Sequence, residues 1–280
     1  MDRLLIIDGM NLLFQMFYGM PSRITGKDGK PIHGTLGFTG ALLKALKFIS
    51  PSHAIAVFDG ETGSFRREID VDYKQNRPDY SAMAEEDTPF CQLDDVYKAL
   101  DLLQIRHVES CGCEADDLIT AYALEFGKET VICSQDSDFF QLISPNITVF
   151  RYRGDNSLLC DTEYIKGKFG VSPEYYADLK ALTGDKADNI RGADGIGPKY
   201  AAELINAFGH LENILDRTDD IKRTCVRRAL EGEGERLMKN LALIRLTGGC
   251  TELPVPFAEL EYKEKGYKTT QIMSLIGLYG

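Results

Sequence analysis

The amino-acid sequence predicts an α/β fold with a parallel sheet, followed by a helical region. Three short apolar runs, at residues 4–7, 54–58 and 130–133, show no polar alternation, which is typical of strands buried on both faces. Helical patterns separate these runs, and strands that alternate with helices indicate βαβ units. Beyond about residue 160 the strand pattern stops and helical periodicity continues.

Each further element follows from its local pattern. A fourth strand is expected at residues 147–152. The helices of the first region are expected at residues 34–49, 93–103 and 114–126, where apolar side chains recur at helical spacing. Those of the second region are expected at residues 164–169, 173–182, 198–208, 211–215 and 221–230, with a last amphipathic helix at 267–278. We therefore place a domain boundary after residue 160, which divides the chain into residues 1–160 and 161–280.

Composition excludes several classes of protein. The chain has 280 residues, of which 44% are hydrophobic and 27% charged, as in globular rather than disordered or fibrous proteins. No run of 18 apolar residues predicts a membrane-spanning helix, and the apolar run before Asp8 is too short for a signal peptide, so we expect a cytoplasmic protein. The seven cysteines and four scattered histidines form no zinc motif, which predicts a reduced protein without zinc.

Carboxylates follow the predicted strands at the points where the strands end. Asp8, Asp59 and the pair Asp136/Asp138 all lie there, and ligands of an open parallel sheet bind beyond the carboxyl ends of its strands. Further acids begin the helix near residue 114 and occupy a glycine-rich loop near residue 185. The nine candidate metal-binding acids are Asp8, Asp59, Glu114, Asp116, Asp117, Asp136, Asp138, Asp185 and Asp188.

Each of these acids alone has an ordinary explanation. An acid after a strand is usually a turn residue or a helix cap, and acids in a first helical turn are favoured by the helix dipole. Nine acids in one cleft, however, repel one another unless cations compensate. Oxygen ligands without histidine or cysteine favour Mg²⁺ or Mn²⁺ over Zn²⁺. Such a set predicts a two-metal site that hydrolyses phosphodiesters.

The net charge of −11 would by itself argue against a nucleic-acid partner, because such proteins are usually basic. Two features nevertheless indicate one. Gly195 and Gly197 open a predicted helix that carries Pro198 and Lys199 in its first turn, a pattern that lets a phosphate approach the backbone. Lys74 and Arg77 are three residues apart, which would place them on one helical face beside Tyr73. A packed helical turn and a solvated helix face are the alternative interpretations.

These pieces occur in the order found in the bacterial 5′→3′ exonuclease / flap endonuclease family, which includes the N-terminal domain of DNA polymerase I. The sequence resembles this family over roughly residues 3–215. The motifs that carry the resemblance are Ile7-Asp8-Gly9, Val57-Phe58-Asp59, Phe65-Arg66, Tyr73-Lys74-Gln75-Asn76-Arg77, Glu114-Ala115-Asp116-Asp117, Asp136-Ser137-Asp138, Gly184-Asp185-Lys186-Ala187-Asp188-Asn189 and Gly195-Ile196-Gly197-Pro198-Lys199.

The resemblance implies a PIN-like α/β catalytic domain with a helical arch at about residues 60–92. It also implies a helical DNA-binding domain with a helix-3-turn-helix at about residues 175–215. Two Mg²⁺ ions, for which Mn²⁺ can substitute, would serve hydrolysis at a 5′ end or a 5′ flap of DNA, or of an RNA primer, in replication and repair. The implied partner is DNA with a 5′ flap or a 5′ end, or an RNA–DNA hybrid. The protein is expected to act as a monomer and to have no membrane partner.

The resemblance also assigns roles to individual residues. Asp8, Asp59, Glu114, Asp116 and Asp136 match the tighter metal site, Asp138, Asp185 and Asp188 match the second, and Asp117 supports the cluster. Lys74 and Arg77 match residues that contact the scissile phosphate, and Tyr73 matches a residue that stacks on the nucleotide at the cut. The implied DNA contacts are Arg66, Arg191, Gly195, Ile196, Gly197 and Lys199. The turn at residues 195–199 could also hold K⁺.

Two departures from the family pattern stand out. Arg191 occupies the place where proline usually precedes Gly192, and residues 79–87 of the arch carry four acids and no base.

Two other functions remain open from the sequence. A module that holds flap junctions without cutting them would not need the intact set of acids. A PIN-type ribonuclease for single-stranded RNA would not need the duplex-binding turn.

Overall fold

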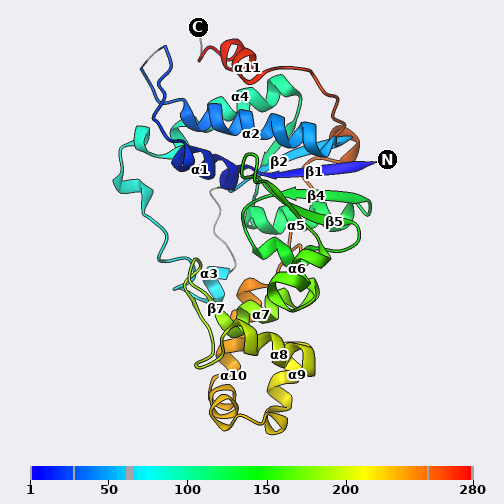
Figure 1. Ribbon diagram of the computed structural model, residues 1–280. Coiled ribbons are helices and arrows are strands. Elements are labelled where there is room, and N and C mark those ends of the chain that lie inside the picture. Colours follow the sequence, from blue (N-terminus) through cyan, green and yellow to red (C-terminus); the bar gives the residue numbers. More distant parts are fainter. Residues whose placement is uncertain (1, 28, 61–65, 251, 279–280) are drawn as a thin grey trace.

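A six-stranded sheet forms the centre of the molecule in the computed structural model, which describes residues 2–27, 29–60, 66–250 and 252–278 (Figure 1). The strands run in the order β3-β2-β1-β4-β5-β6. They are β1 (Arg3–Asp8), β2 (His53–Phe58), β3 (Arg106–Glu109), β4 (Glu129–Cys133), β5 (Ile147–Arg151) and β6 (Leu158–Cys160). The first five are parallel, and β6 pairs antiparallel with β5. The predicted α/β class is confirmed.

The four strands expected from the sequence lie at the centre of this sheet. They are β1, β2, β4 and β5, whose side chains are largely buried because helices cover both faces. The sequence did not reveal the two edge strands. β3 reads Arg-His-Val-Glu and is half exposed, and β6 has only three residues, so neither carries an apolar run.

Helices cover the two faces of the sheet unequally (Figure 1). On one face lie α1 (Gly9–Gly19), α2 (His33–Ile49), α4 (Leu93–Leu103) and α11 (Thr269–Leu275), whose buried side chains share one core with alternate residues of the strands. On the other face lie α5 (Ala115–Glu125) and α6 (Thr162–Phe169), whose core continues without a break into the helical region. One apolar core therefore joins the face of the sheet to the second half of the chain.

The helical region contains α7 (Tyr176–Thr183), α8 (Pro198–Phe208), α9 (Leu211–Asp216) and α10 (Thr224–Ile244). The α10 helix is longer than the ten residues that the sequence predicts, because it continues past Gly232 and Gly234. Leu237 and Leu241 are buried in the shared core, and α10 packs along α7. Tertiary packing thus outweighs the low helix propensity of the two glycines.

The arch region contains only short helices where it is described. These are α3 (Arg66–Ile69) and three 3₁₀ turns at Tyr80–Ala82, Glu85–Asp87 and Pro89–Gln92. Residues 61–65, including Phe65 of the arch motif, lie outside the described residues. Tyr73, Lys74 and Arg77 lie in consecutive turns, and Lys74 has a left-handed φ of 57°. The prediction that Lys74 and Arg77 share one face of a helix, with Tyr73 beside them, is therefore wrong.

The C-terminal segment returns from the helical region to the α/β domain (Figure 1). It passes the sheet at Leu260 and Tyr262, whose backbone groups bond to Ala54 and Ser52, and then α11 packs on α2 and α4. The division after residue 160 places this C-terminal segment in the second domain. In the structure, residues 260–275 pack on the first domain instead. No helix within the described ranges is both long and apolar enough to span a bilayer.

A disulfide joins Cys113, just before α5, to Cys250, just after α10. This bond corrects the prediction that every cysteine is reduced. The sequence offered no indication of it, because the two cysteines are 137 residues apart and belong to no spacing motif. The bond fixes the segment after α10 to the loop that carries Glu114.

Removing this disulfide should destabilise the protein. Closing so long a loop restricts the unfolded chain, so we expect Cys250→Ser to lower the free energy of unfolding by about 2–4 kcal/mol in non-reducing buffer. Chemical denaturation with and without a reductant measures the difference. Cys225→Ser, which alters an exposed free thiol, is the control. Equal stability of Cys250→Ser and the unreduced wild type would contradict the bond.

Candidate active site and metal centre

The carboxyl ends of the central strands open into a cavity of about 780 Å³. Asp8, Asp59, Asp116 and Asp136 line it, and Lys74 and Arg77 lie on its wall together with several aromatic side chains. The parallel register places the ends of the strands level, since Asp8 lies opposite Val57 and Ile7 opposite Cys133. Four acids from four separate segments of the chain therefore face the same space.

Asp8 is held at the end of β1 by two hydrogen bonds. Its carboxylate accepts from the backbone N–H of Asn11 (3.1 Å), which caps α1, and from the hydroxyl of Ser134 (2.7 Å). The Ser134 oxygen in turn accepts from the N–H of Asp136 (2.9 Å). Asp8 is thus both the expected helix cap and part of the cluster. Ser134 and Asn11 are positioning residues that the sequence analysis did not identify.

Asp59 connects the end of β2 to the start of α5. Its carboxylate accepts from the N–H of Ala115 at 3.1 Å. The next residue, Gly60, approaches Ser110 so closely that a Cβ atom would lie 2.0 Å from the Ser110 carbonyl oxygen. A side chain at position 60 would therefore displace Asp59 from its place beside Asp116.

A second group of acids lies beside the first and consists of Asp138, Asp185 and Asp188. One carboxylate oxygen from each lies within 4.8 Å of the others, and all three side chains are largely buried. The ammonium group of Lys180, on α7, forms ion pairs with both Asp138 and Asp185. Lys180 supplies the positive charge that this group of acids requires when metal is absent. No local pattern in the sequence indicates this role of Lys180, because a lysine inside an amphipathic helix usually points to solvent.

A short hairpin presents Asp185 and Asp188. Its strands are β7 (Gly184–Asp185) and β8 (Ile190–Arg191). Gly184 has a φ of 79°, and a Cβ atom there would lie 2.4 Å from the backbone nitrogen of Gly192, so only glycine fits this turn. The hairpin is joined to the arch base: Lys74 N–H donates to the Asp188 carbonyl (3.1 Å), and the Asn76 side chain donates to the Lys186 carbonyl (2.8 Å).

Lys74 and Arg77 each pair with a carboxylate at the edge of the site. Lys74 Nζ lies 2.9 Å from Glu114, and Arg77 lies 3.2 Å from Asp188. The Lys74 side chain is 12% exposed, whereas that of Arg77 is 54% exposed. Lys74 is therefore fixed next to the acids, and Arg77 extends from them toward the open side of the cavity.

The crowding of acids changes their protonation. Burial raises the pKa of Asp8 to about 7, with a further increase from Asp59 and Asp136. Burial likewise raises the pKa of Asp138 to about 7 and that of Asp116 well above its ordinary range, and Asp136 adds to both. Burial opposes the charge of Lys74, but Asp116 and Glu114 raise its pKa above that of a free lysine. Without divalent cations, the acids of the site are thus stabilised by bound protons and by ion pairs with Lys74 and Lys180.

The donor set fits hard divalent cations. Every candidate ligand is a carboxylate oxygen. Oxygens of Asp138, Asp185 and Asp188 lie close enough together to share one ion, and the acids that line the cavity offer further oxygen ligands beside them. The raised pKa values describe carboxylates that lack a sufficient counter-charge, and such ions would supply it. The residues that would hold the ions are Asp8, Asp59, Asp116 and Asp136 on one side and Asp138, Asp185 and Asp188 on the other.

Comparison with known proteins assigns the chain to a family. A family model described as "5′-3′ exonuclease, N-terminal resolvase-like domain" matches residues 3–170, and one described as "5′-3′ exonuclease, C-terminal SAM fold" matches residues 171–268. The chain belongs to the 5′-3′ exonuclease family. The predicted family resemblance is confirmed.

Relatives of two lengths are similar to this 5′-3′ exonuclease family member. A 5′-3′ exonuclease of Aquifex aeolicus is 32% identical over 268 residues, which cover 95% of this chain and 88% of that protein. A thermostable DNA polymerase I of Thermus filiformis is 36% identical over 276 residues, which cover 98% of this chain. The chain spans only 31% of the length of that polymerase.

Solved structures of nucleases share the fold. The flap endonuclease of bacteriophage T5, in a complex with DNA and metal ions, superposes with a TM-score of 0.72 at 26% identity, covering 88% of this chain and 89% of that one. The catalytic core of Rad2 in complex with DNA substrate has a TM-score of 0.62 at 19% identity, covering 99% and 88%. The expected combination of a PIN-like sheet and a C-terminal helical region is confirmed.

Asp117 does not face the cavity, which corrects its place among the metal-binding acids. It is fully buried, and its two oxygens accept from the guanidinium of Arg66 at 2.7 and 2.8 Å. Arg66 is 1% exposed and also donates to the Leu243 carbonyl. The predicted DNA contact by Arg66 is therefore wrong as well, because this pair joins α3, α5 and the end of α10 inside the protein.

Two other assignments also need correction. Tyr73 is 5% exposed and belongs to the shared core, so its ring is not available to stack on a base. The side chain of Ile196 is buried too, which leaves only its backbone for a DNA contact. By contrast, Gly195, Gly197 and Lys199 are exposed.

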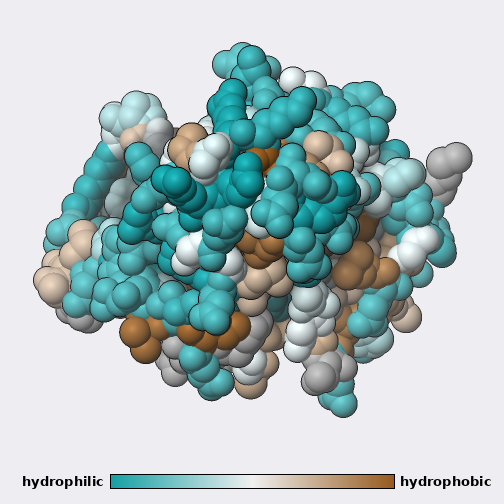
Figure 2. All heavy atoms as spheres, turned by 90° about the horizontal axis from the view of Figure 1, so that it is seen from below, coloured by the Kyte–Doolittle hydropathy of each residue, from teal (hydrophilic) through white to brown (hydrophobic). Residues whose placement is uncertain are grey.

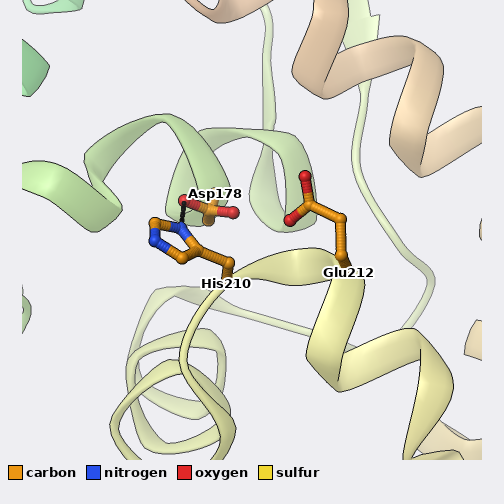
Figure 3. A group of neighbouring side chains, drawn as sticks. All are labelled: Asp178, His210 and Glu212. Atoms are coloured by element: carbon orange, nitrogen blue, oxygen red, sulfur yellow. Dashed lines mark hydrogen bonds and ion pairs between the residues drawn. The ribbon is translucent and has the colours of Figure 1, made fainter.

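A third group of possible metal ligands lies in the helical region and consists of Asp178, His210 and Glu212 (Figure 3). Asp178 accepts from the Leu211 N–H (2.8 Å) at the start of α9 and from the His210 ring (3.1 Å). Arg245 lies 3.9 Å from Asp178 and 3.5 Å from Glu212. Since a guanidinium already compensates these acids, we assign the group to joining α7, α9 and the end of α10.

The metal-free protein should lose stability as the pH rises from about 4 to about 7. Asp8 and Asp138 bind protons more tightly when folded than when unfolded, so their contribution is complete below the unfolded pKa and disappears above about 7. We expect Asp116→Asn to raise the melting temperature in EDTA at neutral pH and to reduce the stabilisation by added divalent ions. Calorimetry measures both, with the exposed Asp219→Asn as control. A melting temperature that does not change with pH would contradict the crowding.

Arg66→Met should destabilise the protein by about 3–5 kcal/mol, because it leaves Asp117 buried without its partner. The double variant Arg66→Met/Asp117→Leu should recover most of this loss. Denaturation measures both variants, and DNA affinity measured on folded Arg66→Met should equal that of the wild type. Weaker DNA binding together with normal stability would restore Arg66 as a DNA contact.

Proposed function

We propose that the protein is a Mg²⁺-dependent, structure-specific 5′ nuclease that hydrolyses phosphodiesters at 5′ ends and 5′ flaps of DNA or of RNA primers in replication and repair. The observation that carries this proposal is the cavity in which carboxylates from separate segments converge beside Lys74 and Arg77. Phosphate esters carry negative charge and would not enter such a cavity without cations, so the acids and the substrate require the same ions.

Different residues of the site would serve different steps: carboxylates would hold the ions, and Lys74 would contact the phosphate. Bound Mg²⁺, or Mn²⁺ in its place, supplies a water of lowered pKa and offsets the charge that develops on the phosphate. Asp8, Asp59, Asp116 and Asp136 would hold one ion, with Glu114 beside them, and Asp138, Asp185 and Asp188 would hold the other. The Lys74 ammonium group, which now pairs with Glu114, would instead pair with a phosphate oxygen of the bound substrate. Lys180 now pairs with Asp138 and Asp185, and it would have to give up these pairs if the two carboxylates held an ion.

The helical region would hold the duplex beside the cut. Gly195, Gly197 and Lys199 offer exposed backbone and a free ammonium to a DNA phosphate, and Arg191 lies nearby in an exposed pair with Asp194. We propose that this turn can also bind K⁺ through its carbonyl groups. Such contacts recognise backbone and shape rather than base sequence, so binding should weaken steeply with salt. We propose that the protein acts on DNA as a monomer.

The two other functions are disfavoured by particular residues. A module that only holds flap junctions would have no use for seven acids kept beside one another at the cost of repulsion. A ribonuclease for single-stranded RNA would have no use for the exposed glycine turn. Cleavage of labelled flap DNA, duplex DNA and unstructured RNA, compared side by side, distinguishes the three functions.

Asp136→Ala should abolish cleavage of a 5′-flap duplex in Mg²⁺ while DNA binding in Ca²⁺ persists. The variant removes one ligand of the first ion but leaves the helical region unchanged. Mapping of the products from a 5′-labelled flap measures cleavage, and a binding titration measures affinity. Turnover that survives in Asp136→Ala would refute the metal-binding role and with it the proposed mechanism.

Lys74→Ala should lower kcat far more than it weakens DNA binding, because its ammonium lies at the acids rather than on the outer surface. Loss of a preorganised charge at a reacting phosphate typically costs about 10²–10³-fold in rate. Single-turnover cleavage and binding titrations give the two quantities. Equal losses in rate and affinity would reduce Lys74 to a docking charge.

A further inference from the structure

We propose that Lys199, Lys222 and Arg223 form a basic track that binds the phosphate backbone of duplex DNA and extends the contact surface of the turn at residues 195–199. The inference rests on the proposed nuclease function and adds a surface that lies outside the catalytic cavity. Its position would let the protein hold more of the duplex than the glycine turn alone can reach.

The basic track is assembled from two elements. Lys199 lies in the first turn of α8, and Lys222 and Arg223 directly precede α10. The guanidinium of Arg223 lies 4.2 Å from the ring centroid of Tyr200, the residue after Lys199. This cation–π contact fixes the start of α10 beside the start of α8 and limits the conformational freedom of Arg223. Charges separated by more than 20 residues in sequence thereby become neighbours.

Within the described residues, no carboxylate forms an ion pair with the charges of the basic track. All three side chains are exposed. Two other arginines of the same region are compensated: Arg217 pairs with Asp220, and Arg236 with Glu233. In a chain with a net charge of −11, basic side chains that lie close together and form no ion pair within the described ranges indicate an external anion.

The surroundings of the basic track favour a polyanion with a regular backbone over an acidic protein. Gly195 and Gly197 lie just before Lys199, and nothing occupies the space where their Cβ atoms would be, so a phosphate can approach the main chain closely. The face at the end of the molecule that carries α8, α9 and α10 is largely hydrophilic, with smaller hydrophobic patches between the hydrophilic side chains (Figure 2). Protein interfaces usually bury an apolar centre, whereas DNA interfaces are polar and positively charged.

Charge reversal of two members tests the basic track. We expect Lys222→Glu/Arg223→Glu to weaken binding to a plain duplex at least about tenfold and to lower the salt slope of log Kd by about 1.8, since each phosphate contact contributes about 0.9. Fluorescence anisotropy without Mg²⁺, at several KCl concentrations, measures both quantities. Lys47→Glu, an exposed lysine of α2 at the opposite end of the molecule, is the matched control (Figure 1).

A second variant separates position from charge. Tyr200→Leu keeps every charge and removes the ring that anchors Arg223, so its loss of affinity should be smaller than that of the double variant, with an unchanged salt slope. Circular dichroism confirms that each variant is folded.

Three outcomes would contradict the proposal that the basic track binds duplex DNA. They are an unchanged salt slope in the double variant, an equal loss in Lys47→Glu, and loss of affinity for single strands as large as for duplex. Because duplex binding is measured without cleavage, a wild type that binds duplex but cuts nothing would refute the nuclease function and leave the basic track standing.

Discussion

The repulsion between carboxylates at the carboxyl edge of the sheet is the constraint on which the rest of the structure depends. Several acids share one cavity, and burial there raises the pKa of Asp8, Asp116 and Asp138. Such an arrangement survives only if positive charge is supplied. In this chain Lys74 and Lys180 supply part of it, and the donor set fits divalent ions for the remainder. The phosphodiester substrate that we propose would be stabilised by the same ions.

The scaffold around the cavity holds the acids against this repulsion. Hydrogen bonds fix the carboxylate of Asp8 through Ser134 and Asn11, and that of Asp59 through the first residue of α5. Below the cavity, the buried pair of Arg66 and Asp117 joins the arch base, α5 and the end of α10. The disulfide of Cys113 and Cys250 links the loop before α5 covalently to the segment after α10. The acids therefore sit on parts of the chain that several independent contacts keep together.

The candidate active site and the helical region that we propose to bind DNA are joined as one body. The hairpin that presents Asp185 and Asp188 is bonded to the turn that carries Lys74, and the same hairpin leads into the glycine turn before α8. One apolar core continues from α5 through α7 and α8 to α10. A duplex held by the helical region, through the glycine turn and the basic track, would consequently be aligned with the metal-binding acids.

The sequence by itself determined the central strands, most helices, the family and the acids that follow the strands, because buried strands and helix faces leave local periodic patterns. It could not determine which neighbour each side chain contacts. Arg66 and Tyr73 stand in motifs that suggest contact with DNA, yet packing buries both. Asp117 follows Asp116 directly, but one step along a helix turns its side chain away from the cavity and toward Arg66. Lys180 and the Cys113–Cys250 bond were decided only by tertiary structure, since each joins residues remote in sequence whose distance no local pattern encodes.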